Sequence, residues 1–317
     1  MALHRFRFKA MGCPCALQIY APSAGDARAW AASARGEIAR LERKYSRYRA
    51  DSLLSRINAS AGDPDGVLVD GETASLFDYA ATCHAQSAGL FDVTSGILRR
   101  AWDFRSGRLP EAAQIEALLP RVGWAKVRWA PPRIALPLEG MELDLGGFVK
   151  EYAADRTAAL LRASGCRSGV VDLGGDLAVV GPHPDGRPWI VGVRDAAHAE
   201  RPALSVPLFA GGIATSGDYE RAMVVGGVRY GHILDPRTGW PIAGLASVTV
   251  LASCCLIAGS ASTIALLHGD RARAWLDALG LPHVRQTHAG EIENRIPAPP
   301  IQSPAAPPAA RHRPAHR

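Results

Sequence analysis

The chain has 317 residues, 48% of them hydrophobic, with a mean hydropathy close to zero and a formal net charge of +6. This length allows one large domain or two moderate ones, and the composition is that of an ordinary globular protein. The 36 Lys and Arg residues are interspersed with 30 Asp and Glu residues. No basic stripe interleaved with aromatic residues occurs, which argues against nucleic-acid binding.

No transmembrane segment is predicted, because the sequence has no run of 18 apolar residues. The N-terminal stretch MALHRFRFKAMGCPC lacks the apolar core of a secretion signal, which favours a cytoplasmic location. A periplasmic or inner-membrane-associated location stays open if the start of the chain is misassigned. The six cysteines have no CxxC spacing and no histidine pattern for zinc, so we expect reduced, mostly buried thiols.

The first part of the chain shows both strand and helix patterns. The segment CALQIYAP alternates as a strand does, and apolar residues at helical spacing follow it. Proline near the first turn is compatible with a short helix, and Pro131-Pro132 separates two segments typical of a hairpin. The predicted elements are a strand at 15–22, helices at 26–45, 72–86 and 110–119, and hairpin strands at 126–130 and 133–137.

Short strands dominate the second part of the chain. Gly, Asp and Pro separate them at hairpin intervals, which predicts a largely antiparallel sheet. Two helical segments follow, at 258–267 and 270–279, so the fold class is α+β rather than a regular βαβ series. The C-terminal stretch is rich in Pro, Ala and Arg and cannot bury enough surface to offset its ordering entropy. We therefore expect one domain over residues 1–289 and a disordered tail over 290–317. The predicted strands are SGVVDL, DLAVV, WIVGVR, LSVPL, GGIATS, RAMVV, VRYGHI and ASVTVL.

The segment ELDLGGFVKEYAADR, residues 142–156, places an acid, two glycines and a lysine at the start of a predicted helix. Glycines let a phosphate or a metal approach the backbone, a helix N-terminus favours anions, and Lys150 is suited to pair with a phosphate. The alternative is that Asp144 is a helix-capping acid and Lys150 a solvated helix residue. Taken alone, the segment does not decide between the two interpretations.

Three later segments add candidates for chemistry. VVDLGGDLAVVG, residues 170–181, repeats the glycine pair after a buried strand, although a tight turn also explains it. GGIATSGDYER, residues 211–221, concentrates small hydroxyls suited to phosphate or ribose, although an Asx-turn loop would look similar. In YGHILDPRTGWP, residues 230–241, His232 and the nearby Asp235 are candidates for proton transfer, although a lone histidine is usually structural. Neither glycine pair fits a Rossmann or Walker motif.

In this order and spacing the segments resemble the FAD:protein FMN transferase family, often called ApbE. The resemblance spans about residues 8–288. Any one block is a weak signal, because Gly-Gly and Asp-Pro are common, but seven blocks in register are a strong one. The blocks are AMGCPC, YSRYRADSLLSRIN, GLFDVTSGILRRAWDF, DLGGFVKEYAADR, VVDLGGDLAVVG with Trp189, ATSGDYER and HILDPRTGWP.

The resemblance implies a T-fold-like α+β architecture with a largely antiparallel sheet and packed helices. It also implies an enzyme that cleaves FAD with Mg²⁺, attaches FMN through a phosphoester to a Thr or Ser of an acceptor flavoprotein of a redox or electron-transfer system, and releases AMP. His232 and Asp235 would handle protons, and the Gly147 carbonyl and Thr263 would bind the metal. The residues implied to contact FAD are Met11, Tyr48, Leu90, Phe91, Asp92, Asp144, Lys150, Thr215, Ser216, Asp218 and Ile233.

Three residues depart from the family's pattern. Gly259 stands where the family has the metal-binding aspartate of its Ala-Asp-Ala-x-x-Thr sequence, although Thr263 is kept at i+4 on the same helical face. Glu151 stands where glycine is common and adds a negative charge beside Lys150, and Cys13 stands where threonine is common. We therefore expect weakened Mg²⁺ binding, and Gly259→Asp to raise Mg²⁺-dependent activity. A flavin-binding protein with reduced or lost transferase activity, or an Mg²⁺-dependent FAD pyrophosphatase, stays open as an alternative.

Overall fold

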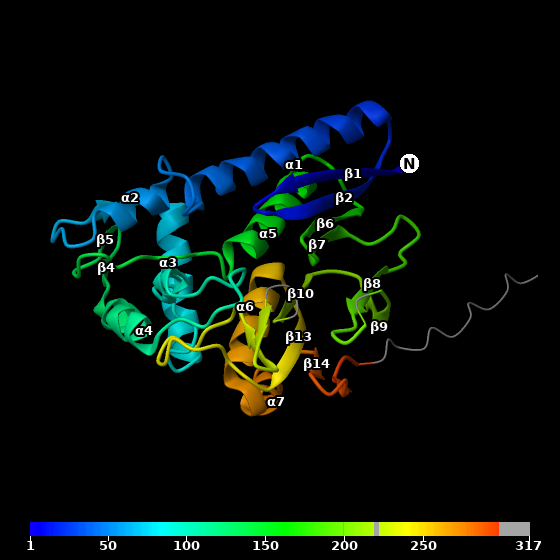
Figure 1. Ribbon diagram of the computed structural model, residues 1–317. Coiled ribbons are helices and arrows are strands. Elements are labelled where there is room, and N and C mark those ends of the chain that lie inside the picture. The colour runs from blue at the N-terminus through cyan, green and yellow to red at the C-terminus, as the bar shows by residue number, and fades with distance from the viewer. Residues whose placement is uncertain (199, 219–221, 298–317) are drawn as a thin grey trace, which may run out of the picture.

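The computed structural model describes residues 1–198, 200–218 and 222–297. At its centre is an eight-stranded sheet, most of whose strands are labelled in Figure 1. The strand order is β1-β2-β6-β7-β10-β13-β14-β15, and every neighbouring pair is antiparallel. The predicted α+β class is therefore confirmed. The strands are β1 (Ala2–Ala10), β2 (Cys13–Ala21), β6 (Gly169–Leu173), β7 (Asp176–Gly181), β10 (Gly212–Gly217), β13 (Leu245–Ala252), β14 (His283–Thr287) and β15 (Ile292–Asn294).

The central strands bury both of their faces in different clusters. On β7, Ala178 and Val180 join the main core, whereas Val179 joins a second cluster on the opposite face. Successive side chains of a strand point to opposite faces, so this division follows directly from the sequence VVDLGGDLAVVG. Apolar residues are needed on both faces because helices cover one of them and a hairpin covers the other.

Three helices cover one face of the sheet: α1 (Ala24–Tyr45), α5 (Val149–Ala163) and α6 (Cys255–His268). Figure 1 shows α1 running over the β1–β2 hairpin, α5 below it, and α6 beside β10 and β13. Helix α1 buries Ala27, Ala31, Ala34, Ile38 and Leu41, which is the spacing of one face of a helix. Its small residues let it lie close to α5 and to the sheet.

The remaining elements surround this core. The hairpin of β8 (Trp189–Arg194) and β9 (Pro202–Leu208) covers the second face of the sheet through Trp189 and Leu208. A small sheet has the order β3-β5-β4. The other bounds are α2 (Leu53–Ala59), β3 (Val67–Leu68), α3 (Gly71–Gln86), η1 (Ser95–Arg100), α4 (Ala112–Leu118), η2 (Leu119–Arg121), η3 (Trp124–Lys126), β4 (Arg128–Ala130), β5 (Arg133–Ala135), β11 (Ala222–Val225), β12 (Val228–Gly231), η4 (Gly269–Arg271) and α7 (Ala272–Ala278).

All the predicted strands and helices occur, with ends that differ by a few residues. Sequence reasoning missed β1, β3, α2, β14 and β15. The predicted domain boundary at residue 289 needs correction, because β15 pairs with β14 beyond it. Of the predicted tail, residues 298–317 lie outside the described residues. All six cysteines are free thiols, four of them buried. Across the described ranges, no helix is both long and apolar enough to cross a membrane.

Candidate active site

Antiparallel pairing brings four separate segments to one end of the sheet. The turn between β1 and β2 precedes Cys13, and Cys15 pairs with Leu173 just before the turn between β6 and β7. Gly212 pairs with Ala178, so the C-terminal end of β10 lies beside the start of β7. The segments MGCPC, LGGD and ATSGD, far apart in the chain, therefore meet at one sheet end, where α5 also begins.

Lys150 lies at this end between two carboxylates. Its Nζ forms an ion pair with Asp176 and lies 3.3 Å from Oε1 of Glu151. Burial by itself lowers the pKa of Lys150, but the two carboxylates outweigh it and hold the pKa above its ordinary value. Lys150 is therefore a protonated, largely buried cation, and the alternative of a solvated helix residue is wrong.

The second carboxylate, Glu151, fills the space beside Gly259 of α6. A Cβ placed on Gly259 would lie 2.5 Å from Cγ of Glu151. Glu151 is only 6% exposed, and its Oε2 has no hydrogen-bond partner among the described residues. Burial, partly offset by Lys150, raises the pKa of Glu151 to about 8. The expectation that Gly259→Asp alone restores a metal site is therefore not supported, because Glu151 occupies the room that the aspartate needs.

Hydroxyl groups from two elements face each other next to this pair. Ser216 on β10 is 2.8 Å from both Ser262 and Thr263 of α6, measured between side-chain oxygens. The Thr215 N–H donates to Asp176 (2.9 Å), and its hydroxyl is 2.8 Å from that of Thr249. Ser216 and Thr263 thus meet where β10 packs on α6, whereas Thr215 reaches Asp176 through its backbone N–H and its hydroxyl lies on the other face of the sheet.

Asp144 is held by backbone and guanidinium groups in front of α5. It forms an ion pair with Arg47, and its Oδ1 accepts from the Gly146 N–H at 3.0 Å. The N-cap of α5 is Phe148, so the alternative that Asp144 caps this helix is wrong. Arg47 also donates to the hydroxyl of Tyr48 (2.8 Å), and Tyr48 is 79% exposed. The predicted Tyr48 and Asp144 are therefore joined through Arg47.

The loop that contains Leu90, Phe91 and Asp92 packs against the exposed Gly147. A Cβ on Gly147 would lie 3.1 Å from the ring of Phe91. The Asp92 carboxylate accepts from the N–H groups of Thr94 and Trp124 at 2.8 Å, so its evident task is to order this loop. Leu90 and Phe91 are buried. The structure thus places Phe91 beside Gly147 and gives Asp92 a structural role, whatever its relation to FAD.

The remaining predicted residues lie on neighbouring turns. The N–H of Met11, in the turn before β2, donates to Glu42 (2.8 Å). Asp218 lies 3.2 Å from His288 and 3.3 Å from Arg229. A Cβ on Gly231 would contact Asp218 at 2.6 Å, so the strand end that leads to His232 and Ile233 passes close to Asp218.

Asp235 is engaged by a neighbour in its own loop. Its carboxylate accepts from Nε of Arg237 at 2.9 Å and from Nη2 at 2.6 Å. Burial raises the pKa of Asp235, but the hydrogen bonds from Arg237 outweigh it and lower the pKa below its ordinary value. Asp235 is therefore an ionised partner of Arg237.

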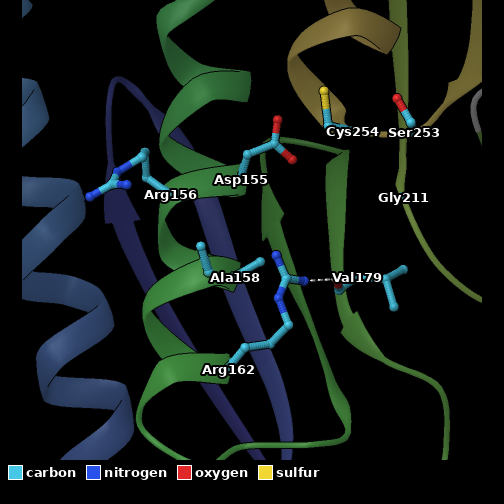
Figure 2. Close-up of a pocket in the computed structure, with 9 residues that line it drawn as sticks. Asp155, Arg156, Ala158, Arg162, Val179, Gly211, Ser253 and Cys254 are labelled. Atoms are coloured by element: carbon cyan, nitrogen blue, oxygen red, sulfur yellow. Dashed lines mark hydrogen bonds between the residues drawn. The ribbon is translucent and has the colours of Figure 1, made fainter. Parts of the chain in front are cut away.

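A separate pocket of about 300 Å³ lies farther along α5, and none of the predicted site residues lines it (Figure 2). Its acid, Asp155, accepts from the N–H groups of Cys255 (2.9 Å) and Leu256 (2.8 Å) and so caps α6. Arg162 donates to the carbonyl of Val179 (2.9 Å). The lining residues are Asp155, Arg156, Ala158, Ala159, Arg162, Val179, Gly211, Ser253 and Cys254.

Sequence reasoning missed three residues of the site. Asp176 follows the second glycine pair and was the available signal for a partner of Lys150. Arg47, inside the block YSRYR, and Ser262, between Gly259 and Thr263, carried no separate signal. Within the described ranges, no group of three or more His, Cys, Asp or Glu side chains is arranged to hold a metal. A cation here would therefore need hydroxyl, carbonyl or substrate oxygens as well as a carboxylate.

The fold and the site together define the class: an α+β protein with a large antiparallel sheet, at one end of which a buried lysine, two carboxylates and several hydroxyls meet. The sequence model of the ApbE family matches residues 11–284. The chain belongs to the ApbE family.

Individual relatives agree with this assignment. The FAD:protein FMN transferase of Treponema pallidum is 32% identical over 285 residues, which cover 80% of this chain and 78% of that protein. The FAD:protein FMN transferase of Rhodobacter capsulatus is 32% identical over 237 residues, which are 70% of this chain. The matched region covers only 43% of the length of that relative. The crystal structure of the ApbE protein from Thermotoga maritima has a TM-score of 0.84 at 30% identity, covering 92% of this chain and 97% of its own. For the flavin transferase ApbE from Vibrio cholerae the TM-score is 0.82 at 25% identity, with coverages of 92% and 96%.

Proposed function

We propose that this protein is an FAD:protein FMN transferase, which attaches FMN through a phosphoester to a Thr or Ser of an acceptor protein and releases AMP. The proposal is supported by its membership of the ApbE family and by the names of its relatives. The observation that carries it in this chain is the meeting of the motif segments around Lys150 at one end of the sheet. The comparisons do not favour the alternative of a flavin binder without turnover.

Lys150, which is paired with Asp176, and the start of α5 supply hydrogen-bond donors at this end. The ammonium of Lys150 and the N-terminal dipole of α5 would attract the pyrophosphate of FAD. Thr215, Ser216 and Asp218 would line the phosphate side. The contacts with the flavin and the nucleotide would be completed by Met11, Tyr48, Leu90, Phe91, Asp92, Asp144 and Ile233. Exposed Tyr48 and buried Phe91 offer aromatic surfaces of the kind that pack on flat rings.

The metal proposed for this site is Mg²⁺, held by the Gly147 carbonyl and the Thr263 hydroxyl. Hard oxygen ligands suit Mg²⁺, and the proposal of a cation here is supported by the buried Oε2 of Glu151, which has no hydrogen-bond partner among the described residues. When bound, the ion would neutralise charge on the pyrophosphate.

His232 is the proposed acceptor of the proton from the incoming hydroxyl, because an imidazole is the commonest general base in proteins. Asp235, held ionised by Arg237, would act with His232 as a fixed negative charge. The acceptor protein is proposed to belong to a redox or electron-transfer system.

One assay tests the proposal directly. The protein is incubated with FAD, Mg²⁺ and an apo-flavoprotein whose mature form carries FMN on a threonine, and AMP release and covalent flavin fluorescence are followed. We expect both signals, and a loss of about 100-fold or more in His232→Asn. The matched control is Asp51→Asn, in an exposed ion pair with Arg49 outside the site, which should label as the wild type does. AMP release without labelling would indicate hydrolysis of FAD instead and would overturn the proposal.

A further inference from the structure

The side chain of Glu151 and the missing side chain of Gly259 occupy the same volume. A Cβ on Gly259 would lie 2.5 Å from Cγ, 2.9 Å from Cδ and 3.1 Å from Oε1 of Glu151. The first of these distances is far below ordinary van der Waals contact. Carboxylates at both positions therefore exclude each other, whereas a carboxylate at either one reaches the same region between α5 and α6.

One polar atom of Glu151 is left without a partner among the described residues. Lys150 is the cation beside two carboxylates, and its Nζ is paired with Asp176. Both carboxylate oxygens of Asp176 have partners, namely Lys150 and the N–H of Thr215. Oε2 of Glu151 is buried and has none. A buried carboxylate oxygen without a partner is destabilising unless a cation or a donor reaches it.

Neutral oxygen atoms lie on the same elements. Thr263 is one turn after Gly259 on α6 and therefore on the same helical face. Gly147 is one turn before Glu151, at the exposed entry to α5. The hydroxyl of Ser216, on β10, lies 2.8 Å from that of Thr263. A carboxylate, a hydroxyl and a backbone carbonyl are the kinds of ligand that Mg²⁺ and Mn²⁺ take.

We propose that Glu151, reaching from α5 into the volume that Gly259 leaves open on α6, supplies the anionic ligand of a divalent-cation site. This inference deepens the proposed function and rests on it for the phosphate that the cation would accompany. The carboxylate that the resemblance places at position 259 of α6 is then supplied by Glu151 of α5, and the metal site still contains one anionic ligand.

The test measures metal binding without turnover. Mn²⁺ is titrated into the protein, and the electron paramagnetic resonance signal of free Mn²⁺ reports the fraction bound. We expect Glu151→Gln, which keeps the shape of the side chain and removes its charge, to bind Mn²⁺ at least about tenfold more weakly than the wild type. Equal binding by Glu151→Gln, or no binding by the wild type, would overturn the inference.

The matched control is Asp172→Asn. Asp172 lies at the same end of the sheet and accepts from the Gly175 N–H at 2.8 Å, but it alternates with Val171 and Leu173 and so points away from α5. This variant removes one negative charge nearby and should bind Mn²⁺ within about twofold of the wild type. An equal loss in both variants would reduce the effect to general electrostatics and would overturn the inference.

A second variant tests the exchange of positions. Glu151→Gly removes the carboxylate from α5, and the double variant Glu151→Gly with Gly259→Asp returns one to the same volume from α6. We expect the single variant to lose Mn²⁺ binding at least about tenfold and the double variant to recover to within about threefold of the wild type. A double variant that folds, as shown by its circular dichroism and thermal unfolding, but does not recover would overturn the exchange.

The outcome is separable from that of the transferase assay. Binding of Mn²⁺ that depends on Glu151, in a protein that neither releases AMP nor labels an acceptor, would contradict the proposed function and leave the metal ligand standing. If the protein labels an acceptor but its Mn²⁺ binding does not depend on Glu151, the proposed function stands and the proposed metal ligand is contradicted.

Discussion

Gly259 is an unusual residue for the middle of a buried helix. Glycine there is less favourable than alanine by about 1 kcal/mol, because it loses more backbone freedom on folding. The reason for it lies on the neighbouring helix, where the Glu151 side chain fills the space of any Cβ at position 259. By contrast, Gly36 on α1 is exposed, and a Cβ there would contact nothing within 4 Å.

These two helical glycines should respond oppositely to alanine. We expect Gly259→Ala to lower the free energy of unfolding by about 1–3 kcal/mol, because the added methyl overpacks against Glu151. Gly36→Ala should raise it by about 1 kcal/mol. Urea unfolding followed by circular dichroism measures both values.

The variant Glu151→Gly tests whether contact with Glu151 is the reason that Gly259→Ala is destabilising. In that background Gly259→Ala should no longer destabilise, because the methyl group enters the space that the glutamate has left. A penalty of equal size with and without Glu151 would place the strain elsewhere in α6.

Three helices are tied together by one acid. Glu72, in the first turn of α3, accepts from Arg40 of α1 at 2.8 and 2.7 Å, from Lys44 of α1 at 2.7 Å and from Tyr152 of α5 at 3.2 Å. Arg40 and Lys44 are one turn apart, so α1 presents both to the same carboxylate. The hydrogen bonds from Arg40, opposed by partial burial and aided by Lys44, lower the pKa of Glu72 to about 2.

Replacing Glu72 with Gln should lower stability at neutral pH by about 1 kcal/mol, a value kept small because solvent screens the partly exposed Arg40. A carboxyl with a depressed folded pKa stabilises above its unfolded pKa of about 4.3 and loses that contribution as the pH falls toward its folded value. The difference between wild type and variant should therefore be full at pH 7 and shrink below about pH 4. Urea unfolding at pH 7, 4 and 3 measures it.

The control for this prediction is Asp51→Asn. Asp51 pairs with Arg49 at 2.8 Å in an exposed position, and its replacement should leave unfolding unchanged at every pH. If the two variants behaved alike, the contact of Glu72 with α1 would not stabilise the fold.

At the scale of the whole molecule, the sheet ends beyond the predicted domain boundary. Glu293 of β15 lies 3.0 Å from Nε of Arg285 on β14 and 3.3 Å from Nε of Arg273. The N–H of Arg295 donates to the carbonyl of His283 (2.8 Å), and Ile296 packs on the cluster under the β8–β9 hairpin. Residues 290–297 thus cover the edge of β14.

Two shortened chains test this edge. A chain ending at residue 297 should unfold at the same temperature as the full chain, because the removed segment is rich in Pro and Ala and offers little apolar surface to bury. A chain ending at residue 289 should lose about 1–2 kcal/mol, or about 2–6 °C in the midpoint of thermal unfolding. Differential scanning calorimetry compares the three chains. Equal midpoints for all three would show that β15 adds nothing to the sheet.

How far the sequence predicts the fold depends on the strength of local patterns. The helix 26–45 and the short strands of the second half are strongly periodic and were predicted. Strand β1, with exposed charged residues at alternate positions, and α2, only 7 residues long, have weak patterns and were missed. Lys150, Thr215, Ser216 and Thr263 were chosen for the site because their residue types and their order resemble a family. Asp176 follows a glycine pair in the sequence, but its ion pair with Lys150 in the folded protein is what places it in the site.

The alternation of strands and helices, the α+β class and the resemblance to a family can be predicted from the amino-acid sequence, because they depend on neighbouring residues and on the order of motifs. Which distant residues touch depends on how the elements pack in three dimensions. The register of antiparallel strands sets Asp176 beside Lys150, and the packing of α5 on α6 sets Glu151 in the space of Gly259. In the sequence, Glu151 and Gly259 are two separate departures from the family's pattern. In the folded protein they are in contact, because α5, which contains Glu151, packs against α6, which contains Gly259.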